Sequence, residues 1–307
     1  MALPLKIIEM IRGRTPEIEC LTNEPLKNHT SLKIGGPVSA LLMPNSAREM
    51  ASLCSMLREF DITPVIIGNG TNLLAEDGAL DIIVVKTTRL NAAQRVGETD
   101  ITADSGVSLS RLATLARDNG LTGLEFAHGI PGTLGGAVLM NAGAYGGDIG
   151  GVVRKTTVFS YEAGIFEQEG AELGFSYRRS RFSDGKDVIL TSTIKLAPGD
   201  RAEITARMDD FDSRRRESQP LELPSAGSAF KRPERGYAAA LIEQAGLKGY
   251  TVGGAQISAK HSGFIVNRGG ASYDDVAALI SHVQETVFKQ SGIELEPEIR
   301  FIKGSAV

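Results

Sequence analysis

Residues 128–147 read HGIPGTLGGAVLMNAGAYGG, a run in which glycine and apolar residues alternate with almost no charge. Clustered glycines let another molecule come close to the backbone. Such a surface suits a flat, weakly charged ligand, for example a ring system joined to a pyrophosphate. The competing interpretation is a glycine-rich helix that packs closely on a sheet. The candidate cofactor-binding residues here are Gly132, Thr133, Gly135, Gly136, Asn141 and Gly143.

A second glycine loop, IGNGTNLL at residues 67–74, directly follows an apolar run that predicts a buried strand. Successive small residues allow backbone N–H groups to point into one concave anion site. Leu73 stands where a dinucleotide fingerprint needs glycine, and no Gly-Lys-Ser/Thr follows as in a P-loop. Alone the loop favours a simple turn, but two such loops in one half of the chain favour a cofactor. Its candidate residues are Gly68, Asn69, Gly70, Thr71 and Asn72.

Length and charge limit the class of protein. The chain has 307 residues, enough for about two domains. Its 33 lysines and arginines against 37 aspartates and glutamates give a net charge of −4. There is no global basic field, so neither nucleic acid nor an anionic membrane is an expected partner.

The sequence also argues against a metal centre and against secretion. Cys20 and Cys54 are too few for a disulfide scaffold or a cysteine cluster. No apolar run approaches the length of a membrane span, and the N-terminus lacks the pattern of a secretory signal. We therefore expect a cytoplasmic protein. The histidines lack the spacing of zinc ligands; they are His29, His128, His261 and His282.

The hydrophobic periodicity predicts mixed α and β structure. Ser46–Glu49 reads as a capping box that opens an amphipathic helix, and Ser272 opens another. Pro220 and Pro224 mark a linker, which places a domain boundary between residues 1–218 and 219–307. Further helices are predicted at 108–118, at 237–244 and in the charged stretch that follows a turn at 198–200 and ends at 214–217. Strands are predicted at 64–67, 81–85, 152–153, 156–161, 188–196 and 294–303.

A third segment, NHTSLKIGGP at residues 28–37, carries polar donors and two glycines that suit the same ligand. Together with the two glycine loops and motifs further on, it resembles the UDP-N-acetylenolpyruvoylglucosamine reductase (MurB) family. The order of the motifs matches the family from about residue 28 to the end. The other matching motifs are YRRS at 177–180, AGSAFK at 226–231, GG at 253–254 and LEPEIRFI at 295–302.

The resemblance implies an α+β protein with a flavin domain of the vanillyl-alcohol-oxidase (PCMH) type. That domain has two subdomains, with a core at about residues 33–198. An α/β substrate domain follows it, and its final strand is a candidate to pack back near the active site. The chain lacks room for an extra tyrosine loop after Tyr177, so it resembles the second type of the family. The expected protein is a cytoplasmic monomer.

The resemblance further implies a flavin-dependent oxidoreductase, a UDP-N-acetylmuramate dehydrogenase. It binds FAD non-covalently, takes NADPH as co-substrate and reduces UDP-N-acetylglucosamine enolpyruvate to UDP-N-acetylmuramate for peptidoglycan synthesis. Ser228 matches the proton donor, with Lys231 as a neighbour able to assist it. Arg178 and Glu298 match the positions that stabilise the enolate, although Glu296 shares the face of Glu298.

The expected substrate contacts rest on weaker matches. Arg232 and His261 replace amide side chains of the better-studied type. One of the three arginines at residues 214–216 is also a candidate to reach the flavin or the substrate. His128 is interpreted as a packing or hydrogen-bonding residue rather than as a flavin attachment site. The full set of expected contacts is Tyr145, Lys231, Arg232, Lys248 and His261.

Two other functions use the same motifs. An FAD oxidase would share the glycine loops but would leave Arg178, Ser228 and Glu298 together without a purpose. A regulatory protein that binds nucleotide sugars would show ligand binding without bleaching of a flavin. The presence of all three candidate catalytic residues favours the reductase.

Overall fold

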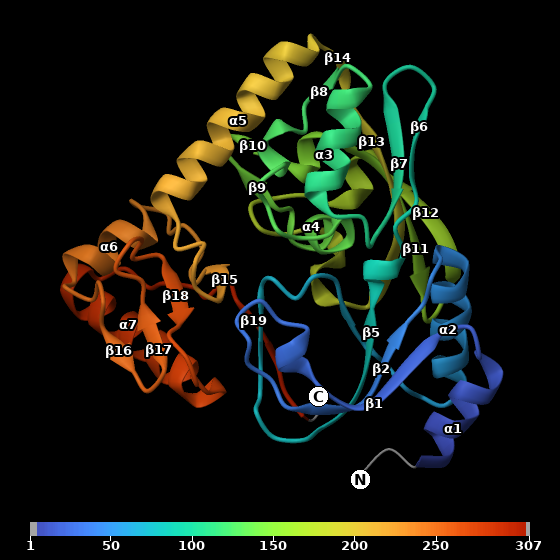
Figure 1. The fold of residues 1–307 in the computed structure, drawn as a ribbon, viewed down its shortest axis with the longest axis horizontal. Coiled ribbons are helices and arrows are strands. Elements are labelled where there is room, and N and C mark those ends of the chain that lie inside the picture. The colour runs from blue at the N-terminus through green and yellow to red at the C-terminus, as the bar shows by residue number, and fades with distance from the viewer. Residues whose placement is uncertain (1–4, 305–307) are drawn as a thin grey trace.

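The computed structural model describes residues 5–304, which form three packed units in chain order (Figure 1). Residues 1–4, the start of the segment considered as a secretory signal, lie outside this range. Strands and helices are mixed, with mainly antiparallel pairing, so the predicted α+β class is confirmed. In the part of the chain that is described, no helix is long and apolar enough to cross a bilayer.

The first unit is a four-stranded mixed sheet in the order β1-β2-β5-β3. Strand β1 is antiparallel to β2, whereas β2 and β3 run parallel to β5. Helix α2 packs on the sheet face that carries Ile83 and Val85. The elements are α1 (Leu5–Arg14), β1 (Glu19–Pro25), β2 (Pro37–Met43), α2 (Ala47–Glu59), β3 (Val65–Ile67), β4 (Leu73–Ala75) and β5 (Leu80–Lys86).

The start of α2 differs slightly from the predicted capping box. The Ser46 hydroxyl accepts a hydrogen bond from the Glu49 backbone N–H, as expected. The Glu49 carboxylate, however, binds the backbone N–H of Asn45 at 2.8 Å instead of that of Ser46. The glutamate therefore caps one residue further back.

The second unit is an antiparallel sheet in the order β12-β11-β13-β7-β6, which packs against α3 and α4 in one hydrophobic core. The two strands predicted at 152–153 and 156–161 form a single strand, β11, with a register shift between Val153 and Lys155. The main elements are β6 (Ala93–Val96), β7 (Asp100–Asp104), α3 (Leu109–Asp118), α4 (Leu134–Met140), β11 (Val153–Ser160), β12 (Gly164–Glu169), β13 (Asp187–Lys195) and α5 (Arg201–Ser218).

Short elements complete the first two units and their loops. β8 (Leu121–Thr122) pairs with β14 (Ala197–Pro198), and β9 (Gly143–Ala144) with β10 (Gly147–Asp148). The 3-10 helices are η1 (Leu26–Asn28), η2 (Thr87–Arg89), η3 (Glu125–Ala127), η4 (Ile149–Gly151), η5 (Gly170–Leu173) and η6 (Arg181–Asp184).

The third unit is an antiparallel sheet in the order β15-β18-β17-β16 with two helices. Ser272 and Asp275 form the reciprocal capping box that starts α7, and the predicted apolar face of α7 is buried. The core of this unit also takes in Leu32, Ile34 and Leu74. The elements are β15 (Ser225–Ser228), α6 (Ala238–Gln244), β16 (Thr251–Val252), β17 (Ala255–Ile257), β18 (Phe264–Asn267) and α7 (Tyr273–Ser291).

The last strand, β19 (Arg300–Ile302), is much shorter than the predicted strand at 294–303. Pro297 lacks a backbone N–H, so the preceding segment makes only an isolated bridge, between Pro297 and Phe230. Beyond it the chain leaves the third unit and pairs in parallel with β4. Figure 1 shows β19 reaching toward the first unit.

Candidate active site

The three polar, glycine-containing segments meet in the structure. A Cβ atom on Gly70, whose φ is +66°, would lie 2.0 Å from the carbonyl oxygen of His29. A Cβ atom on Gly68 would lie 2.1 Å from Thr133 Oγ1. The Asn69 side chain donates to the carbonyl of Pro131 at 2.9 Å. Only glycine fits at these two positions, and the close approach joins the two glycine loops into one cradle.

The cradle contains hydroxyl groups that lack a protein partner. Among the described residues, Thr133 Oγ1 and Ser105 Oγ are buried without a hydrogen bond. Thr133 precedes α4, and the Gly135 backbone donates to the carbonyl of Ser105 at 2.7 Å. A buried hydroxyl without a partner is costly unless a ligand satisfies it. The residues therefore fit a cofactor with a polar, phosphate-like portion.

Asn141, one of the expected cofactor-binding residues, has several hydrogen bonds within the protein. It ends α4 with a left-handed φ of 46°. Its amide group donates to the Ser176 carbonyl at 2.9 Å, and its side-chain oxygen accepts from Gly150 N–H at 2.8 Å. Asn141 thus ties the glycine stretch to the segment before Arg178, and the same contacts place Gly143 beside the candidate catalytic residues.

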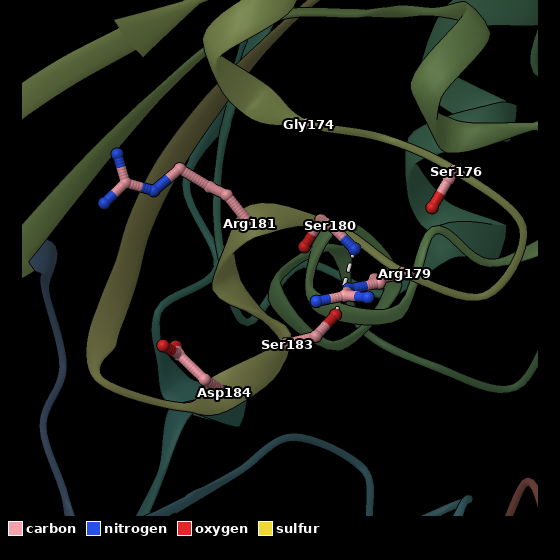
Figure 2. A pocket seen from close by; sticks show the side chains of 7 residues that line it. All are labelled: Gly174, Ser176, Arg179, Ser180, Arg181, Ser183 and Asp184. Carbon is pink, nitrogen blue, oxygen red and sulfur yellow. Dashed lines mark hydrogen bonds between the residues drawn. The ribbon is translucent and has the colours of Figure 1, made fainter.

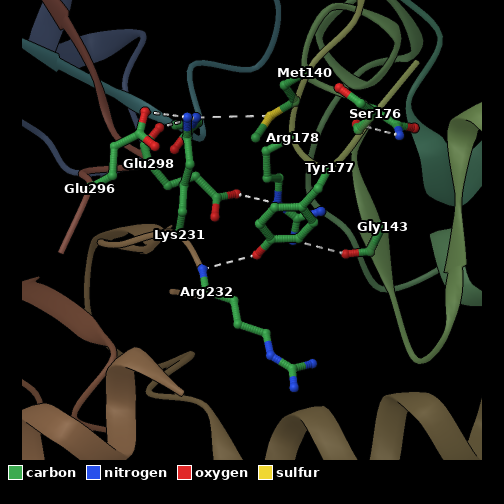
Figure 3. Close-up of polar contacts among 11 residues, drawn as sticks. Met140, Gly143, Ser176, Tyr177, Arg178, Lys231, Arg232, Glu296 and Glu298 are labelled. Atoms are coloured by element: carbon green, nitrogen blue, oxygen red, sulfur yellow. Dashed lines mark hydrogen bonds and ion pairs between the residues drawn. The ribbon is translucent and has the colours of Figure 1, made fainter. Parts of the chain in front are cut away.

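Arg178 is held by a tight hairpin turn. Ser176 and Arg179 exchange backbone hydrogen bonds, and Arg178 has a φ of +53° at the tip. Its Nε donates to Glu298 Oε1 at 2.8 Å, and its terminal nitrogen donates to the Gly143 carbonyl at 3.2 Å (Figure 3). The guanidinium therefore connects the hairpin at 176–179 with the glycine stretch and with the segment that carries Glu298.

Glu298 is the more buried of the two glutamates near the C-terminus. Burial raises the pKa of its carboxyl group above the ordinary value, and the charge of Arg178 opposes that rise. Glu296 is exposed and pairs instead with Lys231 at 2.5 Å. Figure 3 shows the Arg178–Glu298 and Lys231–Glu296 pairs as separate contacts. The geometry thus separates two glutamates that sequence spacing leaves equivalent.

Ser228 lies at the exposed end of β15, next to the segment that carries Glu298. The Glu298 backbone N–H donates to the carbonyl of Ala229 at 2.8 Å. Within residues 5–304, no hydrogen bond connects Ser228 Oγ with Arg178, Glu298 or Lys231. The ammonium group of Lys231 is engaged by Glu296, so the expected assistance to Ser228 is not present in this arrangement.

The five expected substrate contacts lie in different places. Tyr145 adopts a φ of +53° and stacks on Phe211. The backbone N–H of Arg232 donates to the Tyr177 hydroxyl at 3.0 Å, which brings it to the edge of the Arg178 site. Lys231 is next to it in the chain and is bound to Glu296.

Lys248 and His261 belong to a separate polar group on the third unit. Lys248 binds the Glu243 carboxylate at 2.9 Å, and the same glutamate accepts a hydrogen bond from Ser262. His261 Nδ1 accepts from the Gly263 backbone at 3.1 Å. Burial lowers the pKa of His261 below its ordinary value. The structure does not bring this group into contact with Arg178.

Comparison with known proteins identifies the family. Residues 219–302 match the sequence model of the UDP-N-acetylenolpyruvoylglucosamine reductase C-terminal domain, and residues 38–163 match an FAD binding domain. The UDP-N-acetylenolpyruvoylglucosamine reductase of Limosilactobacillus reuteri is 47% identical over 287 residues, which cover 94% of this chain and 96% of the relative. The chain belongs to this reductase family.

Other members of the reductase family support the same conclusion. The protein of that name from Caldanaerobacter subterraneus is 45% identical over 296 residues, 96% of this chain and 98% of the relative. The crystal structure of UDP-N-acetylenolpyruvylglucosamine reductase (MurB) from Thermus caldophilus superposes with a TM-score of 0.78 at 34% identity. It covers 93% of this chain and 98% of that one. The resemblance noted in the sequence is therefore confirmed.

In this member of the reductase family, the structure also answers which arginine of the run at 214–216 approaches the glycine stretch. Arg215 donates to the Gly129 carbonyl at 2.5 Å, and its guanidinium lies 5.8 Å from the Tyr145 ring centroid. Arg214 pairs with Asp210 on its own helix. The sequence alone does not show which of the three arginines approaches the glycine stretch.

Arg300 contacts two segments of the candidate site, and the sequence does not single it out. Its backbone N–H donates to the Asn72 carbonyl at 3.0 Å, and its guanidinium donates to the Ser183 carbonyl at 3.2 Å. Burial lowers the pKa of this arginine. The signal is its place in the LEPEIRFI motif, two residues after Glu298.

Beside the Ser183–Arg300 contact lies a polar cavity of about 380 Å³ (Figure 2). Figure 2 shows the Arg179 side chain over Ser180 and Ser183, while Arg181 points to the other side. Arg181 pairs with Asp187 at 3.0 Å. The cavity thus borders the hairpin that carries Arg178 and makes its flank polar.

Proposed function

We propose that this protein reduces the enolpyruvyl group of UDP-N-acetylglucosamine enolpyruvate to give UDP-N-acetylmuramate, with FAD as cofactor and NADPH as reductant. The observation that carries the proposal is the Arg178 guanidinium, fixed between the Glu298 carboxylate and the Gly143 carbonyl. Family membership supports the same reaction. The site combines a fixed cation with a buried acid, and Ser228 belongs to the segment whose next residue, Ala229, accepts a hydrogen bond from Glu298 N–H. Reduction of a vinyl carboxylate needs stabilisation of negative charge and a source of a proton.

The cradle formed by residues 68–72 and 132–136 is the proposed FAD site. Thr133 Oγ1 is a buried donor without a protein partner, and Gly68 and Gly70 let the loops that surround it pack closely together. FAD, when bound, supplies the hydride chemistry. We propose that residues of this cradle, Thr133 among them, would hold FAD without a covalent bond.

Arg178 binds the carboxylate of the substrate in this proposal. As hydride reaches the vinyl carbon, negative charge develops on the adjacent carbon and on the carboxylate. A guanidinium presents parallel donors that match a carboxylate and do not need to reorganise during the reaction. The left-handed turn and the Glu298 contact fix its orientation in advance.

Ser228 then delivers a proton to the carbon next to the carboxylate. A serine hydroxyl is a weak acid, so its alkoxide needs a nearby cation or acid. Burial raises the pKa of Glu298, so this carboxyl group can hold a proton. The Glu298 backbone donates a hydrogen bond to the carbonyl of Ala229, the residue after Ser228. We propose that Glu298 and Arg178 together stabilise the site while Ser228 donates.

The remaining proposals concern organisation. We propose that residues 1–218 bind FAD and residues 219–307 bind substrate, with β19 returning to the first part. Tyr145, Lys231, Arg232, Lys248 and His261 are the proposed substrate contacts. We also propose that the protein is a cytoplasmic monomer. We assign it to the second family type because the chain runs from the Arg178 hairpin through η6 directly into β13, without an inserted loop.

One anaerobic absorbance experiment tests this function. Purified protein is loaded with FAD, treated with NADPH, and then mixed with UDP-N-acetylglucosamine enolpyruvate. We expect the flavin absorbance to bleach and then to return. A protein that takes up no FAD would disprove the cofactor assignment. Bleaching that returns only with oxygen would replace the reductase by an oxidase.

A further inference from the structure

Helix α5 contacts the glycine stretch at Tyr145 through a residue outside all the motifs. Phe211 stacks on Tyr145 with ring centroids 4.5 Å apart and planes inclined by 4°. The Tyr145 hydroxyl donates to the carbonyl of the same Phe211 at 3.2 Å. Phe211 therefore fixes both the plane and the tip of the tyrosine side chain.

Tyr145 needs such support because of its backbone. Its φ of +53° is rarely adopted by a bulky L-residue, and Gly146, which follows, is also left-handed at +87°. The side chain is 38% exposed, so burial alone does not hold it. A side chain at the neighbouring Gly146 would meet nothing within 4 Å, so space remains at the tip of this loop.

The helix that supplies the contact is itself fixed toward both ends. At its start, Arg201 pairs with Asp118 at 3.0 Å. One turn before Phe211, the Arg207 guanidinium pairs with the buried carboxylate of Glu125 at 3.3 Å. Near its end, the Lys260 ammonium of the third unit donates to the Arg216 carbonyl at 2.6 Å. Figure 1 shows α5 running along the second unit to the third. Phe211 thus reaches Tyr145 from a rigid support.

We propose that Phe211 is a positioning residue for the reductase reaction, one that holds Tyr145 in the orientation that binds the nucleotide-sugar substrate. The proposal rests on the proposed function, since it takes Tyr145 as a substrate contact. Phe211 acts through Tyr145 and does not itself touch substrate. Loss of the aromatic pair therefore affects substrate binding more than the chemical step.

The test compares Phe211→Leu with the conservative variant Phe211→Tyr in the FAD-loaded protein. Phe211→Leu is expected to raise KM for UDP-N-acetylglucosamine enolpyruvate by about 2- to 10-fold, the range for one lost aromatic pair, with kcat within about twofold. Phe211→Tyr is expected to restore KM. A fall in kcat at unchanged KM would overturn the proposal.

A double-mutant cycle with Tyr145→Leu isolates the coupling. If Phe211 acts through Tyr145, Phe211→Leu changes KM in the native background but not in the Tyr145→Leu background. Equal effects in both backgrounds would show that Phe211 acts by another route and would overturn the proposal.

A measurement on the protein alone separates this proposal from the proposed function. Tetranitromethane nitrates accessible tyrosines, and peptide mapping reports each position. Nitration of Tyr145 relative to the exposed Tyr237 is expected to rise in Phe211→Leu and to stay at the native level in Phe211→Tyr. An unchanged Tyr145 rate in Phe211→Leu would refute the positioning role, even if the enolpyruvyl substrate proved to be wrong.

Discussion

At the scale of the residue, Ser228 carries the most specific chemical assignment. Ser228→Ala is expected to leave FAD bound and reducible by NADPH, but to slow reoxidation by substrate by roughly 10²–10⁴-fold, the usual contribution of general acid catalysis. Stopped-flow absorbance of each half-reaction checks this. Ser225→Ala, on the same strand, is the matched control and should behave as the native enzyme. An unaltered reoxidation rate in Ser228→Ala would exclude the serine as proton donor.

Arg178 should affect the same half-reaction by a different route. Arg178→Ala removes the charge that faces the developing carboxylate, so substrate reoxidation should slow by about 10²–10³-fold. Arg178→Lys should recover only part of that loss, because an ammonium group lacks the planar fork. Arg179→Ala, the exposed neighbour in the hairpin, is the control. Slower flavin reduction by NADPH with normal reoxidation would contradict this assignment.

The sequence alone identifies candidate residues but not their contacts. The glycine loops are visible because successive glycines are uncommon, yet only the family resemblance selects Ser228. Spacing leaves Glu296 and Glu298 equivalent, and burial beside Arg178 is what distinguishes Glu298. Arg300 and Phe211 depend on contacts between distant segments, which no local pattern reveals.

At the scale of the element, the glycine loop after β3 has a steric requirement that can be measured. Gly68→Ala places a methyl group 2.1 Å from Thr133 Oγ1, so the two loops must separate. We expect unfolding stability to fall by about 1–3 kcal/mol and FAD binding to weaken. Thermal unfolding and fluorescence titration with FAD report the two effects.

Two further variants serve as controls for the Gly68→Ala measurement. Gly13→Ala lies in α1 with open space around it and is expected to leave FAD affinity unchanged. Thr133→Ala combined with Gly68→Ala removes the clashing atoms, so the double variant should regain stability relative to Gly68→Ala. If Gly68→Ala were as stable as the native protein, the close approach of the two loops would be incorrect.

Elements differ in how clearly the sequence predicts them. Helices α2, α3 and α7 have capping side chains and regular apolar faces, and all three were predictable. β6 is largely exposed and polar, so no alternation marks it. The two-residue strands such as β9 and β10 exist only through pairing with each other. β19 lies within the strand predicted at 294–303, but its parallel pairing with β4 depends on a distant segment, which no local pattern reveals.

At the scale of the whole molecule, β19 ties the end of the chain back to the first unit. It pairs with β4, which follows directly after the glycine loop at residues 68–72, and it comes directly after Glu298. The proposed FAD site and the buried acid are thus fixed relative to each other by one short parallel pair. Mutations that destabilise the third unit should therefore also disturb the geometry of the candidate active site.

The pH dependence of stability gives a measurement on that unit. Burial lowers the pKa of His261 from its ordinary 6.5; Lys248 lowers it further, while Glu243 opposes the shift. Below pH 6.5 the unfolded chain therefore binds a proton that the folded protein resists. This contribution to stability is complete above the unfolded pKa and is lost as the pH falls through the folded pKa.

His261→Gln should reduce the drop in melting temperature between about pH 7.5 and about pH 5.5, because glutamine does not titrate. Thermal unfolding at both pH values measures the difference for each protein. A proton NMR titration of the histidine ring should place its folded pKa below 6.5, the ordinary value. If the variant lost as much stability on acidification as the native protein, protonation of His261 would not contribute to the pH dependence of stability. A smaller drop in the variant would show that the folded protein resists protonation of His261, as its burial and the nearby charge of Lys248 predict.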